Sequence, residues 1–178
     1  GFFAFNLSVM LFHSYGESEG LAITIALNWD LLAVLPFWGL STGLMSLAGR
    51  YLGSRQVDFA KRATYSGVKV GLVTAILYTL MFCFFREGMV QIFLPEGLSS
   101  SDSAYIMILT KKMLAWGAVY IFVHSIGLVF GALLRASGDT RWFMFATITA
   151  DWTCCFLVFL SIRIYEFEPL TTWAIFIL

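Results

Sequence analysis

Charged and helix-breaking residues are scarce in this sequence. Aspartate, glutamate, lysine and arginine make up 12% of its 178 residues, about half of the roughly 25% found in soluble domains. There are three prolines and the formal net charge is zero, so nothing in the composition indicates a linker-rich chain or a nucleic-acid partner. The remainder is apolar: 60% hydrophobic residues, 17% aromatic residues and a mean hydropathy of +0.84 indicate an integral membrane protein.

Cysteine is also scarce, and the common catalytic motifs are absent. The three cysteines, Cys83, Cys154 and Cys155, lie in apolar runs without CxxC or Cys/His ligand spacing. We interpret them as small buried hydrophobic residues rather than metal ligands. There is no GxSxG, HExxH or P-loop sequence. The sequence therefore predicts a protein that is not an enzyme and has no cofactor or metal centre.

One long apolar stretch dominates the chain. About twenty residues from Leu114 to Leu134 contain a single ionisable side chain, His124, and a helix of that length crosses the roughly 30 Å hydrocarbon core of a bilayer. Residues at spacings of four, three and four share one helix face; in this stretch they are Tyr120, His124, Gly127 and Gly131. The stretch ends in a polar loop motif that contains Arg135, Gly138, Asp139, Thr140 and Arg141.

Similar apolar segments recur between polar turns. The sequence predicts an all-α transmembrane bundle of about six helices, at 1–14, 21–48, 63–85, 104–134, 142–162 and 171–178, with a basic loop at 49–62 and a polar connection at 86–102. The first and last helices are too short to cross a bilayer, so we expect residues 1–178 to form part of a longer membrane protein. Lysine and arginine are commoner in the turns near Gly49 and Arg135 than in the alternate turns, which predicts that these two turns face the cytoplasm.

Three ionisable residues fall at membrane depth in these helices: Asp30, His124 and Asp151. A charge near the centre of a membrane helix costs about 2.5–3.5 kcal/mol on insertion scales, and such side chains usually face the bundle interior or a wet cavity. With Tyr120, one turn from His124, we interpret them as a candidate site for a coupling proton or cation. Histidine suits this role because small changes of environment move its titration across neutral pH. The alternative is a set of structural hydrogen bonds between helices.

Two further pairs of residues share a helix face. Thr24 and Asn28 lie one turn apart and give the helix at 21–48 a polar side, which we interpret as facing a substrate cavity. Gly127 and Gly131 form a GxxxG pattern, which allows a neighbouring helix to approach closely and predicts a packing contact.

Three stretches resemble signatures of one transporter family. IALNWDLLAVLPFWGLSTGLMSLAGRYLGSRQVDFAKRA resembles a helix and basic loop of the multidrug and toxic compound extrusion (MATE) family. GALLRASGDTRWFMF resembles that family's LRGxGDTR turn, with Ala136 in place of the usual glycine, and FFREGMVQIF resembles the end of the preceding helix. Their order and spacing extend the resemblance over nearly the whole chain.

The resemblance implies a fold of twelve helices in two lobes, with a site inside the bilayer. This chain would form most of the second lobe and would pair with an N-terminal lobe missing from the sequence. The implied function is secondary antiport in the plasma membrane, or the inner membrane of a bacterium. Organic cations, drugs or other xenobiotics would leave in exchange for protons or sodium ions.

The resemblance also bears on the coupling ion. Some sodium-coupled members have a tyrosine and an aspartate one turn apart on the fourth helix of this lobe. Tyr120 matches the tyrosine, but His124 occupies the aspartate position, and a neutral imidazole is a poor ligand for a hard cation. The glutamate that these members have on the first helix would fall near Gly1, where no carboxylate stands. The resemblance therefore favours proton coupling, or coupling in the missing lobe.

Three other functions are compatible with the sequence. A lipid-linked oligosaccharide flippase of related fold usually needs a more cationic cavity than Lys69 and His124 provide. An integral-membrane enzyme would need Asp30, Asp151 and His124 to converge on a substrate, and a purely structural membrane subunit would need none of them. The expected partners are a small organic substrate, membrane lipids and the missing lobe, and not nucleic acid.

Overall fold

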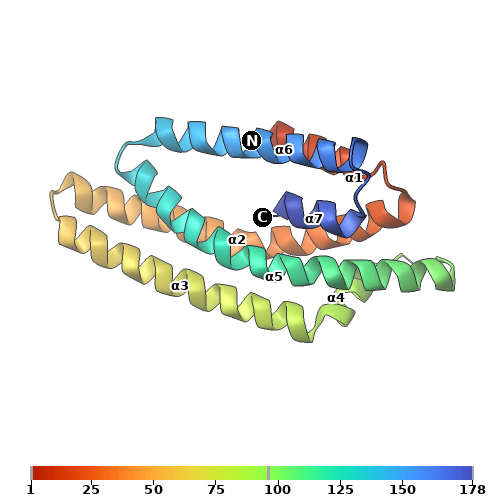
Figure 1. Cartoon of the computed structure of the whole chain (residues 1–178). Helices are drawn as coiled ribbons and strands as arrows, with labels where there is room; N and C mark the ends of the chain where they lie inside the picture. Colours follow the sequence, from red (N-terminus) through yellow and green to blue (C-terminus); the bar gives the residue numbers. More distant parts are fainter. Residues whose placement is uncertain (1, 96, 178) are drawn as a thin grey trace.

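The computed structural model describes residues 2–95 and 97–177, and every regular element within them is an α-helix (Figure 1). The helices are α1 (Phe2–Phe12), α2 (Glu17–Gly53), α3 (Val57–Phe84), α4 (Arg86–Phe93), α5 (Ser100–Ala136), α6 (Thr140–Arg163) and α7 (Pro169–Ile177). Four of them, α2, α3, α5 and α6, are long and apolar enough to cross a membrane. The predicted all-α membrane bundle is confirmed. The predicted helix ends at Gly1 and Leu178, and the position near Gly1 that the resemblance associates with a glutamate, lie outside the described residues.

Helices α2, α3 and α5 extend beyond the apolar runs that predicted them. The expected basic loop at 49–62 is reduced to a turn at 54–56, because α2 continues to Gly53 and α3 begins at Val57. In this turn Arg55 has a φ of 59°. Arginine, lysine and glutamine are good helix formers, so a helix continues after the sequence has ceased to be apolar. Hydropathy therefore locates the spans but underestimates their length.

A short helix occupies part of the expected polar connection at 86–102. Within α4, Met89 and Val90 are buried while the other residues are exposed, so the helix is amphipathic and packs on α5. Lys111 of α5 forms an ion pair with Glu87. Helix α5 then begins after Ser99, whose Oγ accepts a hydrogen bond from the Asp102 backbone N–H at 3.1 Å, a typical N-cap.

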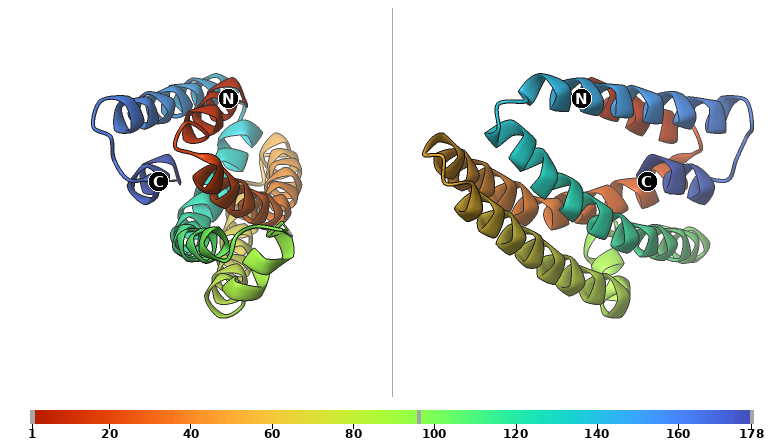
Figure 2. Two further views of the ribbon diagram at one scale, coloured as in Figure 1. Left: turned by 90° about the vertical axis from the view of Figure 1, so that its right-hand side faces the viewer. Right: turned by 60° about the vertical axis from the view of Figure 1, so that its left-hand side comes forward.

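The helices form two layers (Figures 1 and 2). In the first layer α2, α3 and α5 pack against one another, and in the second α1 and α7 pack against α6. Small residues at intervals of four, namely Gly67, Gly71 and Ala75, are buried on one face of α3. A Cβ on Gly67 would lie 2.8 Å from the Leu44 side chain of α2, so glycine permits this close packing.

The main hydrophobic cluster joins the two layers near one end of the bundle. It contains Phe12, Ile23, Met113, Val158 and Trp173, from α1, α2, α5, α6 and α7. We call the opposite end, which holds the turns at 54–56 and 137–139, the Arg135 end. There the buried cluster among the described residues consists of Leu44, Val129 and Ala132 from α2 and α5, with residues of α3 packed against it. From the 137–139 turn, α5 and α6 diverge (Figure 2). The second layer is therefore held mainly at the end remote from Arg135.

The cysteines only partly match the prediction of buried apolar residues. Cys155 is buried and Cys154 is half-buried, but Cys83 is exposed. Cys83 lies near the end of α3, where few residues are covered by other helices. An apolar neighbourhood in a membrane helix does not distinguish a residue that packs on protein from one that points outward.

Candidate functional site

Asp30 is the buried carboxyl group of the bundle interior. It lies on α2 with 8% of its surface exposed and packs against α5, since a Cβ on Gly117 would lie 2.7 Å from Asp30 Oδ1. Within the described part of the chain, this oxygen has no hydrogen-bond partner. A buried polar atom without a partner costs about 1–3 kcal/mol, so native proteins usually supply a proton, an ion or a water. Asp30 therefore requires an explanation beyond packing.

Tyr120 and His124 form a hydrogen-bonded pair on α5. The Tyr120 hydroxyl lies 2.8 Å from His124 Nδ1, and the ring centroids are 4.9 Å apart. His124 Nε2 is buried and has no partner among the described residues. If the tyrosine donates to Nδ1, the neutral imidazole carries its hydrogen on Nε2; if Nδ1 donates, Nε2 is an open acceptor. Either arrangement leaves one imidazole nitrogen ready to exchange a proton or accept a hydrogen bond.

The Asp30 carboxyl group of α2 and the Tyr120–His124 pair of α5 lie along the same face of α5. Gly117, which contacts Asp30, precedes Tyr120 by three residues and His124 by seven, and these intervals bring all three positions onto one side of a helix. Asp151, the fourth predicted coupling residue, lies on α6. Asp151 is half-buried. The four predicted coupling residues thus come from three helices, α2, α5 and α6.

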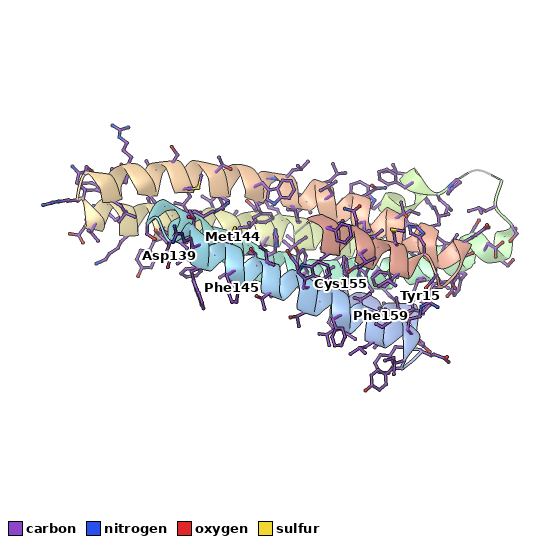
Figure 3. The ribbon with its side chains drawn as sticks, turned by 90° about the horizontal axis from the view of Figure 1, so that it is seen from above. Tyr15, Asp139, Met144, Phe145, Cys155 and Phe159 are labelled. Atoms are coloured by element: carbon purple, nitrogen blue, oxygen red, sulfur yellow. The ribbon has the colours of Figure 1, made fainter. Side chains whose placement is uncertain are left out.

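Thr24 and Asn28, the predicted cavity residues, lie elsewhere on α2. Both are exposed, and Thr24 Oγ1 donates to the Gly20 carbonyl of its own helix at 2.8 Å. Two shallow apolar grooves of about 500 and 370 Å³ lie along α6. Figure 3 looks onto this helix, where Phe145 lines the larger groove and Cys155 and Phe159 line the smaller one. Neither groove is lined by Thr24 or Asn28.

The two glycines of the GxxxG pattern have different surroundings. Gly131 is buried, and a Cβ there would lie 2.6 Å from the Phe143 ring of α6. Gly127 is exposed, and a Cβ there would meet nothing within 4 Å in the described part of the chain. Close helix approach therefore occurs at Gly131 and not at Gly127.

The polar loop motif connects α5 to α6. Gly138 has a φ of 89°, a conformation that suits glycine, and Asp139 occupies the N-cap position of α6 without a side-chain capping bond. Thr140 and Arg141 are exposed in the first turn of α6. Arg135, in contrast, is half-buried: its Nε donates to the Gly131 carbonyl at 3.1 Å.

Three residues near these groups were absent from the sequence-based predictions: Ser41, Gly117 and Phe143. Ser41 Oγ accepts a hydrogen bond of 2.8 Å from Arg135 Nη2. The signals for them are weak: Ser41 is one hydroxyl in an apolar helix, and Gly117 lies on the face of Tyr120 at helical spacing. Phe143 is one of many aromatic residues, and only the tertiary structure distinguishes it.

Comparison with known proteins identifies the family. The MatE family model matches residues 2–157.

The chain belongs to the MatE family.

The MatE match agrees with the family resemblance seen in the loop motifs.

Several relatives of this MatE chain have assigned names. The chain is 28% identical over 149 residues to the probable multidrug resistance protein NorM of Pasteurella multocida, covering 83% of the chain and 30% of the relative. It is 27% identical over 128 residues to the multidrug resistance protein MdtK of Yersinia enterocolitica, covering 72% and 26%. NorM of Vibrio vulnificus is 23% identical over 148 residues, covering 83% and 31%. The chain therefore spans less than a third of each relative's length. No solved structure matches the chain.

Proposed function

We propose that this MatE chain is one lobe of a secondary antiporter that exports organic cations, drugs or other xenobiotics in exchange for protons or sodium ions. The relatives are named as multidrug resistance proteins, which supports efflux of small organic substrates. The four apolar helices that can span a bilayer support an integral membrane location, and we propose the plasma membrane, which is the inner membrane if the source is bacterial. The chain would function with a second lobe of the same protein.

One observation carries the proposal: two ionisable side chains on the packed helices α2 and α5 each have a buried polar atom without a partner among the described residues. Asp30 Oδ1 and His124 Nε2 both lack a hydrogen-bond partner among the described residues. Structural hydrogen bonds between helices would satisfy such atoms, whereas a site that gains and loses an ion or a proton leaves them open in one state. The open atoms of Asp30 and His124 therefore support the coupling interpretation.

The chemistry of the atoms favours a proton as the coupling ion. The open atoms are a carboxyl oxygen and an imidazole nitrogen, both of which bind protons near the pH of a cell when their surroundings are adjusted. A hard cation prefers several oxygen ligands, and His124 supplies nitrogen. We propose that Asp30 and the Tyr120–His124 pair load and release the proton, with Asp151 of α6 as the fourth coupling residue.

The test is transport by the full-length protein in liposomes. An organic cation such as ethidium should leave or enter the vesicles when a pH gradient is imposed. A sodium gradient is applied in a separate experiment. We expect His124→Ala and His124→Gln to flatten the pH dependence of transport and leave the protein folded, since glutamine retains hydrogen bonding without titrating. His13→Gln, at the other histidine, which is exposed, is the matched control.

A second arm of the experiment examines substrate binding. If Thr24 and Asn28 face the substrate, Asn28→Ala should raise the apparent KM for the organic cation and leave the pH profile unchanged. Absence of flux under both gradients would refute antiport. Wild-type pH dependence in folded His124→Ala would remove His124 from the coupling site while leaving antiport intact.

A further inference from the structure

Half of α6 is almost without contacts to the rest of the chain. Between Thr140 and Ala150 every residue is exposed except Phe143, which is half-buried. The buried residues of this helix, Cys155, Val158 and Ser161, all lie in its other half. At the Arg135 end, α6 therefore contacts the first layer mainly through one aromatic ring.

That ring lies in a notch built by α5. Glycine at position 131 leaves room for it, because a Cβ would lie 2.6 Å from Phe143 Cε2. The guanidinium carbon of Arg135 lies 5.0 Å from the centroid of the Phe143 ring, within the range of a cation–π interaction. Phe143 is therefore enclosed by Gly131 beneath it and Arg135 above it.

The same arginine also reaches α2. Its Nη2 donates to Ser41 Oγ at 2.8 Å and its Nε to the Gly131 carbonyl at 3.1 Å. Ser41 Oγ in turn donates to the Leu128 carbonyl of α5 at 3.2 Å. One planar guanidinium thus joins α2, α5 and α6, which lysine could not do because it lacks both the fork of donors and the flat face.

The helices that Arg135 joins are the ones that carry the predicted coupling residues. Asp30 is on α2, Tyr120 and His124 are on α5, and Asp151 is on α6. Movement of α6 away from α2 at the Arg135 end would change the distance between Asp151 and the other three. Packed helices usually shift between discrete arrangements rather than deform continuously, and a small set of polar contacts at one end can select between them.

We propose that Arg135 is a latch: it holds the weakly packed half of α6 against α2 and α5, and its release lets α6 swing about the hydrophobic cluster at the other end. Arg135 is a positioning residue that acts through Ser41 and Phe143. This inference deepens the proposed function, because it names the helix whose movement exposes the coupling site. Its test does not depend on transport.

The experiment measures distances between spin labels in the full-length protein, with Cys83, Cys154 and Cys155 replaced by serine or alanine. One pair, Ser46→Cys on α2 and Met144→Cys on α6, reports on the Arg135 end; both positions are exposed. A second pair, Glu17→Cys and Arg163→Cys, reports on the opposite ends of the same helices. We expect Arg135→Gln to lengthen the first distance by a few ångströms and to leave the second unchanged, because the far end of α6 remains packed in the hydrophobic cluster.

Four further variants sharpen the result. Arg135→Lys should lengthen the first distance as Arg135→Gln does. Ser41→Ala removes the hydroxyl group of α2 that binds Arg135, so it should also lengthen the first distance. Combined with Arg135→Gln, it should lengthen that distance little further. Arg141→Gln, at the exposed arginine of the same turn, should change neither distance.

Three outcomes would overturn the latch. The first is an unchanged 46–144 distance in folded Arg135→Gln and Ser41→Ala, and the second is an equal change in both label pairs, which would indicate general loosening. The third is an effect of Arg141→Gln as large as that of Arg135→Gln. If Arg135→Gln does not fold, Ser41→Ala alone decides. Because these distances are measured without substrate or gradient, failed transport with the expected distance changes would refute the proposed function and leave the latch standing.

Discussion

Adding one methyl group to each glycine of the GxxxG pattern should have opposite effects on stability. At Gly131 a new Cβ would lie 2.6 and 3.0 Å from two ring atoms of Phe143, closer than carbon atoms tolerate. At Gly127 nothing in the described chain lies within 4 Å. Alanine in place of glycine within a helix stabilises it by about 0.5–1 kcal/mol, and this gain is common to both positions. The difference between the variants is therefore the cost of overpacking, about 1–3 kcal/mol.

The assay is thermal denaturation of the purified full-length protein in detergent. Unfolding of such proteins is commonly irreversible, so all variants are compared at one heating rate. We expect Gly127→Ala to melt at or above the wild-type midpoint and Gly131→Ala clearly below it. Phe143→Leu, which replaces the ring with a smaller side chain, should partly rescue Gly131→Ala, so the double variant should melt above the midpoint expected from adding the two single shifts. Equal midpoints for the two alanine variants, or strict additivity with Phe143→Leu, would refute the packing of Phe143 on Gly131.

Two other substitutions test single groups. Asp30→Asn should melt at or above the wild-type midpoint, because a neutral amide costs less to bury than a carboxylate, and it should flatten the pH dependence of transport. A lower midpoint with an unchanged pH profile would contradict the role of Asp30. Asp58→Asn, at the exposed end of α3, is the control. The Lys111 ammonium, through a hydrogen bond and its charge, lowers the pKa of the exposed Glu87 carboxyl below its ordinary value. The pair therefore stabilises the fold above the unfolded-state pKa of glutamate and ceases to do so as the pH falls through the lowered pKa. Glu87→Gln should thus lower the melting midpoint slightly at neutral pH, and the two melting curves should converge in acid; a difference that persists in acid would contradict the ion pair.

The membrane spans could be predicted from the sequence because hydropathy is a local property. Helix α5 was located by its apolar run, and its stop at the 137–139 turn by glycine and charged residues. The extra turns at the ends of α2 and α3 could not be located in this way, since polar helix formers continue a helix into water without a change of pattern. Helix α4 was missed for a related reason: its buried side consists of Met89 and Val90 alone, too few for a detectable period.

Candidate site residues could be predicted from the sequence only where burying the side chain costs free energy. Asp30 and His124 stood out because ionisable groups at membrane depth need a reason; in the structure His124 is hydrogen-bonded to Tyr120, and Asp30 packs against α5. Their partners could not be predicted, since Gly117 and Phe143 matter through contacts with other helices. No spacing along one helix encodes which aromatic side chain of another helix will lie over a glycine. Arg135 was recognised as part of a loop motif, but its bond to Ser41 depends on how α2 and α5 pack.

The two sides of α2 constrain how this lobe meets the rest of the protein. One side carries Asp30, Phe37 and Ser41, which are all buried, and Ser41 accepts a hydrogen bond from Arg135. The other carries Thr24 and Asn28, which are exposed within this chain. An asparagine at membrane depth would be costly if it faced lipid, because no water or protein group would satisfy its amide. We therefore propose that the exposed side of α2 faces a second lobe of the protein or water between two lobes. Under the proposed antiport, either position would bring Asn28 within reach of a substrate while Asp30 lies on the other side of the helix. Helix α2 would then separate the substrate from the coupling proton.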